Sequence, residues 1–288
     1  MGSETGLADR VRPQTDKADR AEVWVAEKAQ LRDEGWCVLP DILDRAGAAF
    51  VLERLWAAAA ESERRGGRTF MPELDPNTSN VRVFNLLDID PVFRELIQHP
   101  TALEMVRAVL GPDFLVSNFT ANIARPGSGS MSVHSDQALV VPEPWHAPWS
   151  LNIIWCLTDV RGDNGATLFL PGSHRFLRRA DLPADPLSHM RPFEAKAGSI
   201  IVMEGRVWHT SGANITRNED RALLFGYYSA SFLRPQVNWN ALLSPEVQAG
   251  AGPELRRWLG LDAEANVNIA TGTLEPLGLQ HAQNGGQS

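Results

Sequence analysis

The hydrophobic pattern of this 288-residue chain changes its period at residue 114. Before that point, apolar residues recur at helical spacing over 46–64 and 91–110, and Gly or Gly-Pro follows each stretch. After it come short runs rich in β-branched and aromatic residues, such as FLVSNFTANIA, SLNIIWCL and RALLFGYYSASF, separated by Gly, Pro, Asn and Asp. Helices followed by consecutive strands predict an antiparallel β-sandwich or jelly roll with helices packed against it.

The same pattern predicts how the chain is divided. Residues 1–20 are polar and aperiodic and 271–288 are rich in Gly and Gln, so we expect a flexible N-terminal arm and a disordered C-terminal tail. Between them we predict a single domain over 21–270. Its helical part covers about 21–112, with one early strand in GWCVLPDIL, and its jelly-roll core covers about 113–235.

Composition limits the partners and the compartment of this chain. A formal net charge of −8 and a pI near 5.4 argue against nucleic acid or an anionic membrane as partner. No apolar run approaches the length of about 18 residues that marks a membrane span, and the N-terminus lacks a signal pattern. Cys37 and Cys156 stand far apart in apolar surroundings. We therefore expect buried free thiols and a reducing, cytoplasmic compartment.

The stretch SVHSDQ (132–137) places a histidine and an aspartate two residues apart. On a strand, positions i and i+2 share a face, so His134 and Asp136 would project into one space. With 7 His and 35 Asp+Glu in the chain, about one such pair is expected by chance, so the pair needs a partner. VWH (207–209) supplies His209 on a later strand. Two imidazoles and one carboxylate form the facial triad of non-haem Fe(II) sites.

Arg221 begins the strand RALLFGYY. An arginine inside an apolar barrel is costly unless it meets an anion, and its planar fork suits a carboxylate. A dicarboxylic 2-oxo acid could chelate the iron at one end and reach Arg221 with the other. The alternative is a surface ion pair with Glu219 or Asp220, because a turn precedes Arg221.

Taken together, four segments resemble the phytanoyl-CoA dioxygenase-like (PhyH) family of Fe(II)/2-oxoglutarate-dependent oxygenases: His134-Ser-Asp136, DNGATLFLPGSHR (163–175), VWH and Arg221. The resemblance covers residues 30–240 and implies a double-stranded β-helix, a cupin-type jelly roll, supported by the N-terminal helices. It implies His134, Asp136 and His209 as iron ligands and O2 as co-substrate. It also implies Arg221 and Thr167 as the residues that bind the distal carboxylate of 2-oxoglutarate.

The chain departs from this family at one position. Many relatives that act on natural products have Gln three residues before the first histidine, where this chain has Met131. Asn122, on the preceding strand, is the residue that we expect to replace this co-substrate contact. The intact Asp136 argues against the halogenase branch, in which a small residue makes room for a halide.

The loop ALVVPEPWHAPW (138–149) directly follows the predicted ligands and is rich in Pro and aromatic residues. It is either a cover of the core or a wall of the substrate pocket. On the second interpretation, the residues that flank the pocket mouth are Gln137, Trp145, His146 and Trp149. Phe119 and Tyr228 are predicted to line its interior, although one of Tyr227 and Tyr228 must face away because neighbours on a strand alternate.

The predicted function is an Fe(II)/2-oxoglutarate-dependent oxygenase that hydroxylates, desaturates, epoxidises or rearranges a small, largely apolar molecule and releases succinate and CO2. No basic cluster indicates a coenzyme A phosphate site, so we favour a secondary metabolite such as a terpenoid, alkaloid or polyketide over a lipid or acyl substrate. The other classes considered are a non-oxidative metal-dependent cupin enzyme and a non-catalytic ligand-binding protein. A homodimer is compatible with the sequence, but no motif supports it.

Overall fold

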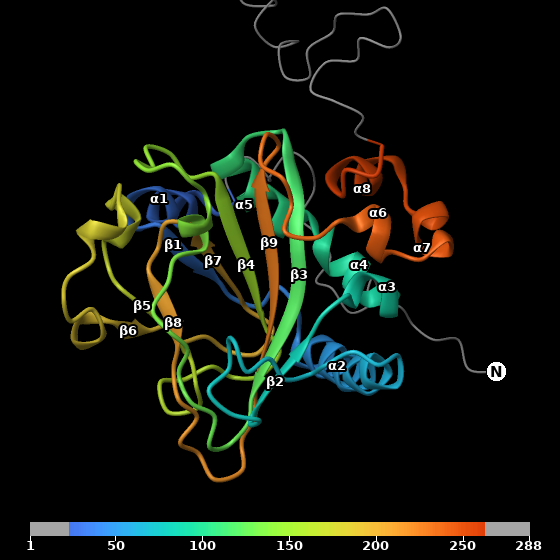
Figure 1. Ribbon diagram of the computed structural model, residues 1–288, viewed down its shortest axis with the longest axis horizontal. Helices are drawn as coiled ribbons and strands as arrows, with labels where there is room; N and C mark the ends of the chain where they lie inside the picture. The colour runs from blue at the N-terminus through green and yellow to red at the C-terminus, as the bar shows by residue number, and fades with distance from the viewer. Residues whose placement is uncertain (1–22, 263–288) are drawn as a thin grey trace, which may run out of the picture.

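The computed structural model describes residues 23–262 and contains two facing antiparallel sheets, with helices on the outer face of the larger one (Figure 1). The larger sheet has the strand order β1 (Trp36–Leu39), β7 (Ile200–Glu204), β4 (Ser150–Cys156), β9 (Arg221–Ala230), β3 (Phe114–Ala124) and β2 (Asn80–Val83). The smaller sheet has the order β6 (Arg191–Pro192), β5 (Thr167–Phe169) and β8 (His209–Ser211). The predicted cupin-type jelly roll is confirmed.

Two groups of helices cover the larger sheet. The N-terminal group consists of α1 (Val25–Glu34), α2 (Arg45–Arg64), α3 (Leu86–Ile89), α4 (Pro91–Ile97) and α5 (Pro100–Leu110). The C-terminal group, which the sequence pattern did not reveal, consists of α6 (Trp239–Leu242), α7 (Pro245–Gly250) and α8 (Pro253–Trp258). These helices are too short to show helical periodicity. Between residues 23 and 262, no helix has the length and apolar character needed to cross a membrane.

Local sequence explains where the N-terminal helices begin. Asp44 accepts a hydrogen bond from the Gly47 N–H and so caps α2. Asp90 caps α4 through the Val92 N–H, and a proline follows at the first helical position, where no N–H is needed. The predicted arm (1–20) and tail (271–288) lie outside the described residues, so the predicted domain limits stay predictions.

Each central strand of the larger sheet divides its side chains between two environments. In β4, Ile153 and Trp155 belong to the core on the helical side, whereas Ile154 packs between the two sheets and Asn152 faces a cavity there. This is the alternation expected of a strand that is covered on both faces. Along such a strand, every second side chain packs against the helices, and the polar side chains between them point into the space between the two sheets.

Strand β3 changes its facing pattern at a bulge. Val116 pairs with Tyr228 of β9 and Asn118 pairs with Tyr227, so Ser117 is one residue in excess. Before the bulge, Val116 packs on the helical side; after it, Phe119 does. The insertion therefore turns the residues at 118, 120 and 122 toward the space between the sheets.

His99, beside the larger sheet, makes folding stability depend on pH. Its buried ring packs edge-on against Trp155, and neither ring nitrogen has a hydrogen-bond partner in the described part of the chain. Burial lowers its pKa to about 4. The unfolded ring has a pKa of about 6.5 and therefore binds more protons than the folded one between pH 6.5 and 4. We expect this group to reduce the free energy of unfolding by about 3 kcal/mol as pH falls through that window. Urea denaturation of His99→Phe, which keeps an aromatic ring, should show a shallower pH dependence than the wild type. An identical dependence would contradict this assignment.

Candidate metal centre

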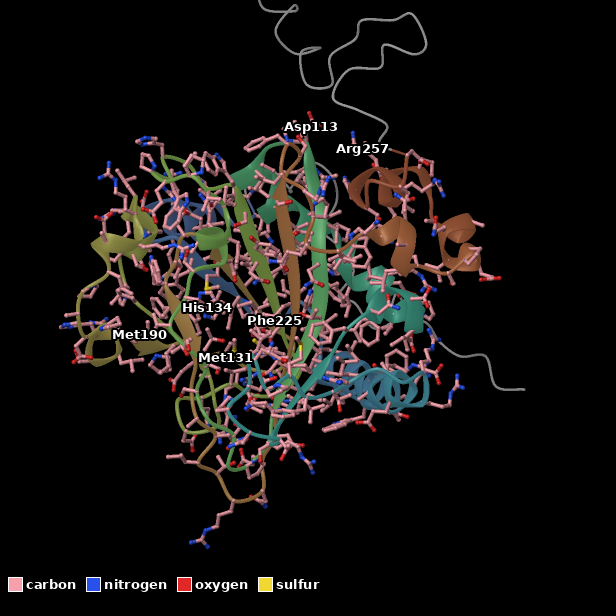
Figure 2. The ribbon with its side chains drawn as sticks, in the orientation of Figure 1. Asp113, Met131, His134, Met190, Phe225 and Arg257 are labelled. Atoms are coloured by element: carbon pink, nitrogen blue, oxygen red, sulfur yellow. The ribbon has the colours of Figure 1, made fainter. Side chains whose placement is uncertain are left out.

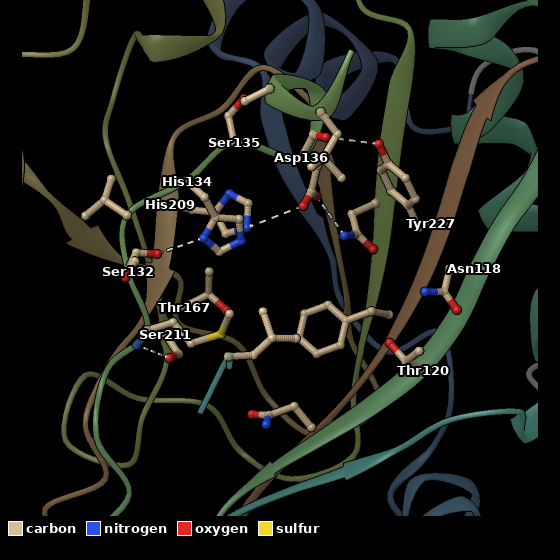
Figure 3. Close-up of a pocket in the computed structure, with 18 of the residues that line it drawn as sticks. Asn118, Thr120, Ser132, His134, Ser135, Asp136, Thr167, His209, Ser211 and Tyr227 are labelled. Carbon is tan, nitrogen blue, oxygen red and sulfur yellow. Dashed lines mark hydrogen bonds and ion pairs between the residues drawn. The ribbon is translucent and has the colours of Figure 1, made fainter. Parts of the chain in front are cut away.

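His209 comes together between the sheets with two side chains from a distant segment, His134 and Asp136 (Figure 3). His134, Asp136 and His209 each offer one ligand atom, and these atoms all lie within 4.8 Å of one another. The two histidines form a β-bridge: the His134 N–H donates to the His209 carbonyl at 2.9 Å, and the return bond measures 2.7 Å. Asp136 Oδ1 lies 3.9 Å from His209 Nε2. The group has the donor set and spacing to hold a metal ion.

The backbone orients both imidazoles. The Nδ1 atoms of His134 and His209 lie 2.9 Å from the carbonyls of Ser132 and Val207, so each Nδ1–H donates outward. This tautomer leaves the Nε2 lone pairs free to bind a metal. Burial, followed by the neighbouring His134, lowers the pKa of His209 to about 4 and keeps that ring neutral.

Asp136 was predicted to lie on the same strand as His134, but it lies in a turn that follows His134. His134 lies in an isolated bridge, and Asp136 begins the 3-10 helix η3 (Asp136–Leu139). The i, i+2 argument for a shared strand face is therefore wrong. The two side chains meet because the chain turns directly after the bridge.

Asn152 fixes the orientation of the Asp136 carboxylate. Its Nδ2 donates to Asp136 Oδ2 at 2.9 Å, which leaves Oδ1 turned toward His209. Tyr227 adds a hydrogen bond from its hydroxyl to the Asp136 backbone carbonyl at 3.3 Å. Asn152 was not among the predicted site residues. The signal was an amide alternating with apolar residues in SLNIIWC.

Loss of the Asn152 amide should weaken metal binding. We expect Asn152→Leu to raise the dissociation constant for Co(II) about 10- to 100-fold, because a carboxylate without its outer hydrogen bond is no longer held for one-oxygen ligation. Calorimetric titration of the apoprotein measures this. Asn118→Leu, the same change at another cavity position, is the control. Equal affinities for Co(II) in the two variants would contradict the role of Asn152.

The metal centre opens into a cavity of about 570 Å³ between the sheets. Figure 2 shows Met131, His134 and Phe225, all of which line it, between the larger and smaller sheets. The cavity also contains the three residues predicted to bind the co-substrate, Arg221, Thr167 and Asn122. The structure thus brings the predicted ligands and the predicted co-substrate contacts together.

Arg221 is buried, with 1% of its surface exposed. Its Nε donates to the Gly165 carbonyl at 2.8 Å, and its Nη1 lies 3.1 Å from both the carbonyl and Oδ1 of Asn122. Among the described residues no carboxylate pairs with it. Burial, followed by the charge of Arg82, lowers its pKa to about 10. A buried cation facing a cavity favours an anionic ligand.

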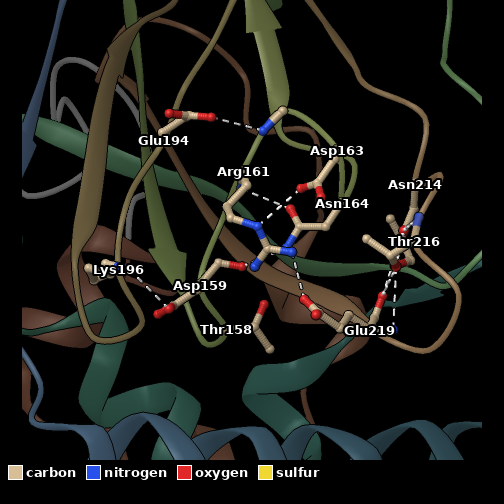
Figure 4. A network of polar contacts seen from close by, with 12 residues as sticks. Thr158, Asp159, Arg161, Asp163, Asn164, Glu194, Lys196, Asn214, Thr216 and Glu219 are labelled. Carbon is tan, nitrogen blue, oxygen red and sulfur yellow. Dashed lines mark hydrogen bonds and ion pairs between the residues drawn. The ribbon is translucent and has the colours of Figure 1, made fainter.

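The alternative for Arg221, a surface ion pair, is wrong. Glu219 instead accepts from Arg161 at 2.6 Å, at the other side of the turn (Figure 4). Arg161 also bonds Asp163 at 3.1 Å, so these exposed groups satisfy one another. Arg221, by contrast, is buried at the start of β9.

A second arginine of the cavity was missed. Arg82 of β2 donates from Nε to both oxygens of the buried Asp75, at 2.9 and 2.8 Å, and its Nη2 lies 2.8 Å from the Met131 sulfur. Met131, the position at which this chain departs from its relatives, therefore lies against a cation. The four-residue β2 is too short for its alternation to point to Arg82 in the sequence.

Four predicted substrate contacts around the 138–149 loop are wrong. Gln137 is fully buried, donates from Nε2 to the Ala147 carbonyl at 2.8 Å and accepts from the Trp149 N–H at 2.7 Å, so it closes the loop. Trp145 is also fully buried, and its indole N–H donates to Val140. His146 is exposed, and Trp149 packs against Phe232. None of these four side chains lines the cavity, and the loop contributes Ala138 and Leu139 instead.

The two predicted interior residues are also wrong. Phe119 packs against Phe93 on the helical side, and the Tyr228 hydroxyl donates to the Ile97 carbonyl at 2.8 Å. Tyr227 is the tyrosine that lines the cavity. Alternation in β9 was predicted correctly, but the face was assigned to the wrong member of the pair.

With this geometry in place, comparison with known proteins identifies the class. The profile of the phytanoyl-CoA dioxygenase (PhyH) family matches residues 31–222, and the chain belongs to this family of dioxygenases. It is 50% identical over 234 residues to dioxygenase af480 of Aspergillus fumigatus, covering 81% of this chain and 76% of that protein. It is 27% identical over 196 residues to dioxygenase cdmA of Talaromyces verruculosus, covering 64% and 65%.

Solved structures share the fold. The non-haem α-ketoglutarate-dependent epimerase SnoN from nogalamycin biosynthesis superposes with a TM-score of 0.60 at 20% identity, covering 81% of this chain and 91% of SnoN. HygX of Streptomyces hygroscopicus, solved with nickel and 2-oxoglutarate, gives 0.60 at 15% identity, covering 79% and 94%. At such identities the likeness concerns the fold.

Proposed function

We propose that this protein is an Fe(II)/2-oxoglutarate-dependent oxygenase that oxidises a small, largely apolar molecule. The observation that carries the proposal is one cavity that holds both a His–Asp–His group and a buried arginine without a carboxylate partner among the described residues. A non-oxidative metal enzyme has no evident use for that arginine.

The donor set fits Fe(II). Two neutral imidazoles and one carboxylate oxygen occupy three positions around the ion and leave three for a bidentate 2-oxo acid and O2. His134, Asp136 and His209 would hold the iron. When bound, iron supplies the activation of O2 that is coupled to decarboxylation of 2-oxoglutarate to succinate and CO2.

The far carboxylate of 2-oxoglutarate fits the Arg221 end of the cavity. Arg221 offers a charged fork there, and Thr167 lies on the same wall. Asn122 Nδ2 is buried and has no partner among residues 23–262, so one further donor is available at this end. Asn122 Oδ1 is engaged by Arg221, which means that Asn122 would also hold the guanidinium in place.

The rest of the cavity suits an apolar substrate. Phe84, Phe225, Trp208 and Leu139 contribute hydrophobic surface to its wall. Such a wall binds a hydrocarbon skeleton and excludes water from the reacting carbon. A secondary metabolite is the proposed class, which the fungal dioxygenase relatives and the epimerase of nogalamycin biosynthesis support.

Oxygen uptake tests the proposal. The apoprotein, supplied with Fe(II) and 2-oxoglutarate, should consume O2 and form succinate in equal amounts, and candidate substrates should accelerate both. Zn(II) in place of Fe(II) should give neither. O2 uptake independent of 2-oxoglutarate, or a hydrolysis product formed with Zn(II), would contradict an oxygenase of this type.

We also propose a reducing, cytoplasmic compartment. Cys37 and Cys156 are buried free thiols. Burial is the main factor that raises the pKa of each to about 12, so both stay protonated and unreactive. Purification from the cell interior with both thiols titratable after denaturation would agree with this.

A further inference from the structure

One end of the cavity carries polar side chains that the proposed chemistry does not use. Asn118, Thr120 and Gln236 line it. Figure 3 shows Asn118 and Thr120 projecting from β3 across the cavity from the two histidines. Neither the metal nor the far carboxylate of 2-oxoglutarate needs these groups. These three side chains are therefore available to bind another part of the substrate.

The β3 bulge is what brings these groups into the cavity. If β3 ran through Ser117 as a regular strand without the bulge, Asn118 and Thr120 would share the face of Phe114 and Val116 and turn toward the helical core. Two polar side chains would then be buried among apolar ones at a cost in free energy. The bulge thus re-aims part of a strand at the cavity.

The bulge residue also holds Gln236. Ser117 Oγ accepts from the Gln236 N–H at 3.0 Å, and the Ser117 carbonyl accepts from the Val237 N–H at 3.2 Å. The Asn118 Nδ2 then donates to Gln236 Oε1 at 3.1 Å. Through these hydrogen bonds the β3 bulge holds Asn118 and Gln236 side by side at the cavity wall, and we call these two residues the amide pair.

The amide pair keeps one donor and one acceptor unused. Asn118 Oδ1 and Gln236 Nε2 have no partner within residues 23–262. A hydroxyl group both donates and accepts, so it can bond with both members of the pair. A carbonyl can accept from Gln236. Glu73 and Arg179 also line the cavity and have opposite charges, so these side chains give it no preference for an ionic substrate.

Asn118 lies near the middle of β3, whereas Asn122 lies near the end of β3 at which the co-substrate residues gather. Asn118 and Asn122 share a strand face four residues apart, which corresponds to about 13 Å. Asn122 contacts Arg221. Tyr227 of β9 pairs with Asn118, lines the cavity and donates from its hydroxyl to the carbonyl of Asp136. A substrate bonded at Asn118 would therefore lie beside Tyr227 and extend from there toward the metal.

We propose that Asn118 and Gln236 form a recognition site for a hydroxyl or carbonyl oxygen on an otherwise apolar substrate. The inference rests on the proposed function and narrows its substrate class to oxygenated skeletons rather than hydrocarbons or anions. Binding of this oxygen determines which end of the substrate faces the metal. Gln236 is exposed and Asn118 is half-buried, so water can bond to both amides in the free protein. An apolar analogue that covers the amides removes this water without replacing its hydrogen bonds, so the site disfavours a substrate that lacks the oxygen.

Binding of matched terpenoids tests the inference without turnover. The full chain, loaded with Ni(II) and 2-oxoglutarate, is titrated with cedrol and its parent hydrocarbon cedrane, and with borneol and bornane, by tryptophan fluorescence. We expect at least one alcohol to bind about 10-fold more tightly than its hydrocarbon. Asn118→Leu and Gln236→Leu should each remove that preference and leave hydrocarbon binding equal or tighter. Asn218→Leu, an exposed asparagine outside this cavity, should keep it.

Three results would overturn the inference: equal binding of each alcohol and its hydrocarbon, no binding of either alcohol, or a preference that survives in both leucine variants. The proposed function is tested separately by 2-oxoglutarate-dependent O2 uptake with Fe(II). A protein that consumes O2 but shows no preference for alcohols would keep the function and lose the recognition site.

Discussion

His134→Ala should abolish succinate formation by the Fe(II)-loaded protein. One of three ligand atoms that lie within 4.8 Å of one another would be missing, and the site would no longer hold iron in a catalytic geometry. Metal catalysis contributes several kcal/mol to the barrier, so we expect a loss of about 10³-fold or more. Asp136→Ala should behave alike. Succinate formation is measured by chromatography, together with bound iron by mass spectrometry.

The matched control is His146→Ala, since that histidine is exposed and outside the cavity. It should retain wild-type iron content and succinate formation. A thermal melt of each apoprotein separates loss of metal from loss of fold. A folded His134→Ala protein that still turns over would contradict the assignment of this ligand.

Arg221→Gln is expected to raise the KM for 2-oxoglutarate by about 10- to 100-fold. The variant keeps hydrogen-bond donors for Gly165 or Asn122 but removes the buried charge. Hydrogen bonds to charged groups contribute about 1.5–3 kcal/mol, which corresponds to that factor. Because the contact is remote from the reacting carbon, kcat should change less than KM. Steady-state kinetics at varied 2-oxoglutarate measure both constants.

A binding experiment tests the contact between Arg221 and 2-oxoglutarate without catalytic turnover. 2-Oxoglutarate should raise the melting temperature of the wild-type Ni(II) protein and raise that of Arg221→Gln much less. Arg161→Gln, at the exposed pair with Glu219, should respond like the wild type. An unchanged KM in Arg221→Gln would mean that another residue, such as Arg82, binds the far carboxylate.

Local chemistry explains why much of the site could be predicted. Few kinds of site combine a histidine and an aspartate two residues apart with a second histidine after a strand and an arginine that begins a further strand. Alternation in β9 then put Arg221 and Tyr227 on one face and Tyr228 on the other. Regular strands convert a sequence period into a side-chain direction, so the alternation that puts Arg221 in the cavity also puts Tyr227 there, whereas the prediction had chosen Tyr228.

The sequence by itself determined the fold class and indicated that His134, Asp136 and His209 converge; that Arg221 binds an anion stays a prediction. Only the tertiary structure decided that Gln137 braces a loop, that Asn152 holds the carboxylate and that Ser117 turns β3 toward the cavity. The physical reason is that periodicity specifies direction only while a strand stays regular. A bulge or turn shifts every later side chain by one position, and contacts between distant segments decide where such a shift is stable.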